Sequence, residues 1–140
     1  MTFALGATSL ANLQGVHPDL VRVVNRAIGA TMQDFTVTCG VRTVAQEAED
    51  VARGVSHTMH SRHIGGFAVD LVPWINGEPV WDWNAIYSIC AAMRGSAILE
   101  KVPLRWGGCW DRQLCELPGD APGVEMAHNA YIQRFETANS

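Results

Sequence analysis

Apolar side chains recur at helical spacing in three parts of the chain. The first part begins at His17-Pro18, the second runs from Asp82 to about Glu100, and the third runs from near Pro122 to Phe135. Proline suits the first turn of a helix, and the Asp82 carboxylate can cap the second helix. The predicted apolar faces comprise Leu20, Val23, Val24, Ala27 and Ile28; Ile86, Ile89, Cys90, Met93 and Ala97; and Val124, Ala127, Tyr131 and Phe135.

Strand-like patterns lie between these helices. Phe35-Thr36-Val37-Thr38 is short and rich in residues that favour strands, and it ends at Gly40. Phe67 to Trp74 predicts a buried strand, which Asn76-Gly77 would turn into a hairpin. Leu104 to Gly108 predicts a further short strand that enters a tight turn.

A short helix is predicted between the first two strands. Thr43 and Gln46 have the spacing of a capping box, and Gly54 would end this helix after about Arg53. Residues 55–66 are rich in Ser, His and Gly, which predicts a loop. Together these elements predict an α+β fold, in which a small antiparallel sheet is flanked by helices.

The composition is that of a globular domain. The chain has 140 residues, of which 48% are hydrophobic and 17% charged, and this length suits one domain. The net charge of -4 and the absence of a basic stripe argue against a nucleic-acid partner. No apolar run approaches the ~18 residues of a membrane span, so we expect no membrane insertion. The four cysteines form no Cys-x-x-Cys pair, and we expect free, mostly buried thiols.

His63 and Asp70 carry the strongest chemical signal. They lie on either side of Gly65-Gly66, where glycine allows the chain to fold back sharply. Imidazole nitrogen and carboxylate oxygen are zinc ligands, and a catalytic zinc site has three protein ligands and one open position. An aspartate in an apolar strand must be paired or metal-bound if it is buried. A capped turn or a simple His63–Asp70 hydrogen bond is the alternative explanation.

The blocks around this pair resemble those of a known family. Residues 54–63 followed by 68–74 are similar to the signature of the zinc L-alanyl-D-glutamate peptidases found among phage endolysins. These enzymes belong to the D-alanyl-D-alanine peptidase, or Hedgehog-like, superfamily. The blocks 17–20, 34–37 with 40–43 and Gln46, and 104–108 with Trp110-Asp111 match in the same order, so the resemblance covers roughly residues 10–115.

The resemblance implies a fold, a cofactor and the roles of three residues. It implies the D-alanyl-D-alanine peptidase fold and a Zn²⁺ ion held by His63 and Asp70. Arg42 matches an arginine near the site, where it would hold a substrate carboxylate or the developing oxyanion. A structural salt bridge is the alternative role for Arg42.

Neighbouring residues have less specific expected roles. Ser61 and Arg62 would either brace the ligand loop or form a solvated loop surface. Trp106 would pack beneath the site or belong to the core. His57 and His60 fall at positions that the family pattern leaves open and lack the i, i+4 spacing of a helical metal site, so we expect them to be exposed and not ligands.

The third zinc ligand of the family is missing from its expected place. In the family it is the histidine of a late Asp-Gly-Pro-His motif, whose aspartate is thought to be the general base or acid. The segment Asp120 to Met126 has two interpretations. It is a degenerate copy, with Gly123 at the ligand position and Asp120 as the catalytic base, or it belongs to an insertion with the motif beyond Ser140. The helical spacing after Asp120 favours the insertion, and His128 is a weaker candidate ligand.

Residues 1–140 are therefore expected to form one peptidase domain that lacks its C-terminal ligand-bearing segment. The implied function is zinc-dependent hydrolysis of the L-alanyl–D-glutamate bond in the peptidoglycan stem peptide. We expect an endolysin-like monomer, made in the host cytoplasm without a signal peptide, that acts on the cell wall after release. The alternatives are a D-alanyl-D-alanine carboxypeptidase and a truncated or inactive relative that only binds peptidoglycan.

Overall fold

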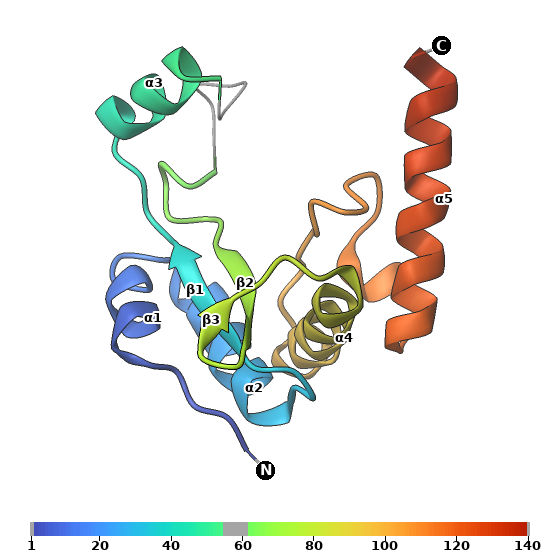
Figure 1. Ribbon diagram of the computed structural model, residues 1–140, viewed down its shortest axis with the longest axis horizontal. Coiled ribbons are helices and arrows are strands. Elements are labelled where there is room, and N and C mark those ends of the chain that lie inside the picture. The colour runs from blue at the N-terminus through green and yellow to red at the C-terminus, as the bar shows by residue number, and fades with distance from the viewer. Residues whose placement is uncertain (1, 55–61, 140) are drawn as a thin grey trace.

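A three-stranded antiparallel sheet in the order β1-β2-β3 is flanked by helices (Figure 1). The computed structural model describes residues 2–54 and 62–139. The mixture of helices with a small antiparallel sheet confirms the predicted α+β class. The elements are α1 (Ala7–Asn12), α2 (Pro18–Ala30), β1 (Phe35–Cys39), α3 (Val44–Ala52), β2 (Asp70–Ile75), β3 (Glu78–Pro79), α4 (Trp83–Glu100), the 3-10 helix η1 (Leu114–Glu116) and α5 (Ala121–Asn139).

The hairpin between β2 and β3 forms where the sequence predicts it. Asn76 and Gly77 both have positive φ angles, 53° and 81°, which the favoured two-residue hairpin turns require. The strand before this turn is shorter than predicted, because β2 begins at Asp70. The N–H of Phe67 bonds to the carbonyl of Arg62 at 2.9 Å, so the chain here closes a loop before it joins the sheet.

The helices α2 and α4 pack against each other and supply much of the core. His17 caps α2 with its ring, because Nδ1 accepts the N–H of Asp19 at 3.1 Å, and Asp82 caps α4 through the N–H of Ala85. All five predicted apolar residues of α2 are buried. On α4, Ile86 is only half-buried and Tyr87 takes the buried position beside it.

The helix α1 has no counterpart in the predicted elements. It has six residues, and tertiary contacts hold it against β1. The Ser9 hydroxyl accepts the N–H of Val37 at 3.0 Å, and the Asn12 amide donates to the Val37 carbonyl at 2.8 Å. These side chains therefore satisfy the backbone groups on the outer edge of β1, which would otherwise remain open for pairing.

The predicted strand at Leu104 to Gly108 is a turn with an isolated bridge between Trp106 and Cys109. The N–H of Cys109 bonds to the Trp106 carbonyl at 3.0 Å, so Gly107-Gly108 turns the chain before a ladder can form. All four cysteines are free thiols. Burial raises the pKa of the Cys90 thiol to about 12.

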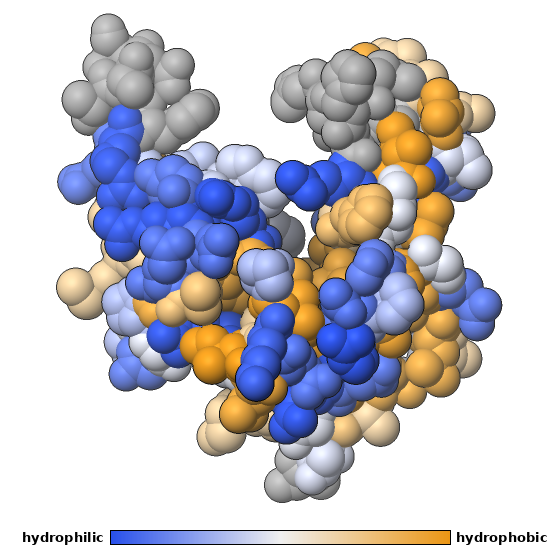
Figure 2. Space-filling view, turned by 180° about the vertical axis from the view of Figure 1, so that it is seen from behind, coloured by the Kyte–Doolittle hydropathy of each residue, from blue (hydrophilic) through white to orange (hydrophobic). Residues whose placement is uncertain are grey.

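The last helix, α5, begins at Ala121, close to the predicted start. Its first turns pack on α4, and Val124 and His128 are buried there. The helices α3 and α5 extend toward the same side of the molecule (Figure 1), and the surface between them is hollowed (Figure 2). No helix within the described residues has the length and hydrophobicity needed to cross a membrane.

Candidate metal centre

The loop that carries His63 is held by backbone contacts. The carbonyl of His63 accepts the N–H of Arg42 at 2.9 Å, which ties the loop to the segment after β1. Gly66 has a φ of +79°, and a Cβ at this position would lie 2.6 Å from the carbonyl oxygen of Gly15. The turn therefore needs glycine for both its conformation and its close approach to the segment before α2.

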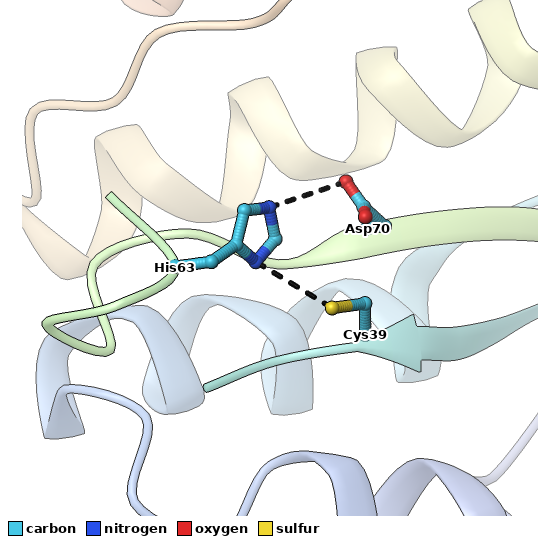
Figure 3. Close-up of side chains that lie close together, drawn as sticks. All are labelled: Cys39, His63 and Asp70. Atoms are coloured by element: carbon cyan, nitrogen blue, oxygen red, sulfur yellow. Dashed lines mark hydrogen bonds and ion pairs between the residues drawn. The ribbon is translucent and has the colours of Figure 1, made fainter. Parts of the chain in front are cut away.

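Three side chains converge at this loop: Cys39 from the end of β1, His63 from the loop and Asp70 from the start of β2 (Figure 3). The His63 Nε2 lies 3.5 Å from the Asp70 Oδ1, and the Cys39 Sγ lies 3.8 Å from the His63 Nδ1. One potential ligand atom from each residue lies within 4.8 Å of the other two. The structure thus brings His63 and Asp70 together as their spacing predicts, and adds Cys39.

The His63 imidazole is oriented by the backbone. Its Nδ1 lies 2.8 Å from the Gly40 carbonyl oxygen, so Nδ1 carries the proton and donates it. In a neutral ring the lone pair then lies on Nε2, the nitrogen that faces Asp70. Histidines that bind metals commonly make this same contact with their other nitrogen.

The charged forms of His63 and Asp70 stabilise each other. The hydrogen bond to Asp70 is the main cause that raises the pKa of His63, and the bond to His63 is the main cause that lowers the pKa of Asp70. The Asp70 side chain is 50% exposed, whereas the His63 side chain is 12% exposed. Without a metal, the two residues thus favour a charged pair at the surface end of the sheet.

The donor set of this group fits a zinc ion. Zinc binds nitrogen, oxygen and thiolate sulfur, and ligand atoms in a tetrahedral site lie about 3.3–3.7 Å apart. The 3.5 Å separation between His63 Nε2 and Asp70 Oδ1 is close to that spacing, whereas the 3.8 Å contact of Cys39 is with Nδ1, the nitrogen that faces the Gly40 carbonyl. The group therefore has the donor chemistry of a three-ligand site, and its His63–Asp70 pair already has the spacing of two ligands.

Arg42 lies beside this group and contacts two carboxylates. Its Nη2 lies 3.5 Å from the Asp70 Oδ2, and its Nε lies 3.4 Å from the Asp50 Oδ2. The two oxygens of Asp70 thus face different partners, Oδ1 toward His63 and Oδ2 toward Arg42. This arrangement contains the salt bridge that was the alternative role for Arg42, and it also places the guanidinium at the candidate site.

Other predicted residues lie outside the group. Asp120 caps α5, where its carboxylate accepts the Gly123 N–H at 2.8 Å, so its catalytic role stays a prediction. His128 is 6% exposed, and its ring stacks on Trp83 with centroids 4.6 Å apart. Trp106 packs against His128 and the core.

The remaining predicted residues are Arg62, Ser61, His57 and His60. Arg62 is exposed, and its carbonyl closes the loop onto Phe67. His57, His60 and Ser61 lie outside the described residues.

Cys39 is the member of the group that the sequence did not single out. The available signal was its place directly before the Gly40-Val41-Arg42-Thr43 block, at the end of a predicted strand. Burial is the main cause that raises the pKa of its thiol, and the nearby Arg42 opposes that shift.

Comparison with known proteins identifies the class of this chain as a peptidase. The chain belongs to the phage L-alanyl-D-glutamate peptidase family, whose family model matches residues 1–120, and the predicted family is thereby confirmed. It is 36% identical over 115 residues to the L-alanyl-D-glutamate peptidase of Escherichia phage T5, covering 79% of this chain and 84% of that protein. The crystal structure of the Serratia marcescens L-Ala D-Glu endopeptidase ChiX matches with a TM-score of 0.70 and 38% identity, covering 82% of this chain and 83% of that one.

Proposed function

We propose that this chain is a zinc-dependent endopeptidase that hydrolyses the L-alanyl–D-glutamate bond of peptidoglycan stem peptides. The family and the names of its relatives support the bond that is cleaved. The observation that most supports a metal ion here is the orientation of the His63 ring. Its Nδ1 is bound to the Gly40 carbonyl, and its Nε2 faces Asp70 at 3.5 Å. As an endolysin-like monomer, the protein would reach the cell wall after release from the host cytoplasm.

In this proposal, each residue of the site has a definite task. His63 would hold the zinc ion through Nε2, with the ring fixed by the Gly40 carbonyl. Asp70 would hold it through Oδ1, while Arg42 restrains the other carboxylate oxygen. The bound ion would act as a Lewis acid toward water and the scissile carbonyl. The Arg42 guanidinium would donate charged hydrogen bonds to the oxygen on which negative charge develops.

The first expected result is stoichiometric zinc in the purified protein, together with new amino termini released from purified peptidoglycan. Those termini should belong to glutamate, and removal of the metal by a chelator should abolish their release. Release of free alanine instead would indicate the carboxypeptidase. A protein that holds no metal and cuts no bond, yet sediments with peptidoglycan, would contradict the proposal in favour of a binding protein.

Arg42→Lys is expected to lower kcat by about 10²-fold while zinc content stays unchanged. Lysine keeps the charge but loses the planar fork, and that fork gives an arginine its fixed donors. Arg53→Lys is the matched control, because Arg53 also pairs with Asp50, at 3.2 Å, and is a surface residue outside the group. A loss of thermal stability in Arg42→Lys with kcat unchanged would assign Arg42 to the structural salt bridge alone.

A further inference from the structure

Cys39 is the one member of the three-residue group to which the proposed function gives no task. It occupies the last position of β1 and lies directly opposite Asp70 in the ladder between β1 and β2. Residues opposite each other on antiparallel strands bring their Cβ atoms within about 4.5–5.5 Å. The sheet itself therefore places a thiol beside one of the two predicted zinc ligands (Figure 3).

An irregularity in the strand pairing creates this placement. Leu71 pairs with Val37, and the next residue of β2, Asp70, pairs with Cys39 rather than with Thr38. Such a bulge places two residues of one strand against one of its partner, and it commonly redirects a side chain next to a functional site. With regular pairing, the residue opposite Asp70 would be Thr38, which is exposed and offers no sulfur.

The distances allow the three side chains to close on one ion. The largest separation within the group is no more than 4.8 Å, whereas ligand atoms around zinc lie about 3.3–3.7 Å apart. The group must thus contract by at least on the order of 1 Å, and the Cys39 sulfur must move toward Nε2, the nitrogen that would bind the ion. The Cys39 Sγ now lies nearest the Nδ1 edge of His63, so the main movement is a rotation of the short cysteine side chain.

The chemistry favours sulfur as the missing donor. Thiolate is among the preferred ligands of zinc, and a metal ion deprotonates a thiol that it binds. In the part of the chain that the structure describes, no second cluster of His, Cys, Asp and Glu could hold a metal. The other two candidates lie outside the group: Asp120 caps α5, and the His128 ring is 6% exposed and stacks on Trp83.

We propose that the Cys39 thiolate is the third protein ligand of the metal ion, completing a Cys39–His63–Asp70 donor set. This inference rests on the proposed function, because it assumes that a metal binds at His63 and Asp70. On binding, the thiol proton passes to solvent and the sulfur moves from the Gly40 carbonyl, 3.7 Å away, to the ion. The competing role is a half-buried thiol that only packs beside the ring.

Titration of the metal-free protein with Co²⁺ tests this inference. A cobalt–thiolate bond produces an intense charge-transfer absorption in the near ultraviolet, which nitrogen and oxygen ligands do not produce. We expect this band in the unmodified protein and in the control Cys115→Ala, whose cysteine is exposed and outside the group. We expect it to vanish in Cys39→Ser, with zinc affinity at least about 100-fold weaker.

The possible outcomes distinguish a failure of the Cys39 ligand proposal from a failure of the proposed function. If Co²⁺ binds and gives visible bands without the charge-transfer band, or if that band persists in Cys39→Ser, Cys39 is not a ligand and the zinc peptidase proposal stands. If no Co²⁺ binds to the unmodified protein, both proposals fall.

A second measurement needs no variant and thus does not depend on the folding of Cys39→Ser. Zinc should slow the alkylation of Cys39, read by mass spectrometry, and leave the rate at Cys115 unchanged. Equal rates at Cys39 with and without zinc, in protein that contains the metal, would overturn the inference.

Discussion

His63→Ala is expected to reduce peptidoglycan cleavage by at least about 10³-fold, because the metal contributes several kcal/mol of transition-state stabilisation. The variant loses the Nε2 that faces Asp70 and the ring that the Gly40 carbonyl orients. The measurement is the rate of release of new amino termini from purified peptidoglycan, combined with metal content. The fold should persist, since His63 lies on a loop and Asp70 keeps its contact with Arg42.

The matched control is His17→Asn. His17 is also a histidine with an Nδ1 contact, but that contact caps α2, and asparagine is a good residue at this position. Its activity and zinc content should equal those of the unmodified protein. If His63→Ala retains both zinc and cleavage, the metal lies elsewhere and the proposed function fails.

Features fixed by neighbouring residues were predictable from the sequence. The Asp82 cap of α4, the capping box of Thr43 and Gln46, and the Asn76-Gly77 turn each depend on a few adjacent residues, and the structure confirms all three. The convergence of His63 and Asp70 was predictable in part: the glycine turn between them is local, but the loop is also held by Arg42 and packs against Gly15.

Features that depend on distant partners were not predictable in this way. Helix α1 is held by Ser9 and Asn12 bonding to Val37, residues at least 25 positions apart along the chain. Cys39 enters the site because a bulge shifts the pairing of β1 with β2. Neither the register of a sheet nor the position of a bulge follows from hydrophobic alternation alone.

Gly40 connects the packing of the fold to the geometry of the site. It is buried between Cys39 and the Arg42 block, and its carbonyl accepts the His63 Nδ1 proton. A Cβ at Gly40 would overlap the carbonyl oxygen of Asn12 at the end of α1, and it would lie 2.9 Å from a methyl group of Val16. Backbone atoms cannot rotate away as a side chain can, so β1 and α1 would have to separate.

Gly40→Ala is therefore expected to destabilise the protein by about 3 kcal/mol or more, the upper range for overpacking, and to lower Tm by roughly 10 °C. Zinc affinity should fall as well, because the strand end that orients His63 must move. Gly95→Ala is the matched control: Gly95 lies inside α4, a Cβ added there would meet no atom within 4 Å, and alanine should raise stability by up to about 1 kcal/mol. Thermal unfolding with and without zinc measures both effects. A Gly40→Ala protein with unchanged Tm and zinc affinity would show that the contact between α1 and β1 does not hold the site in place.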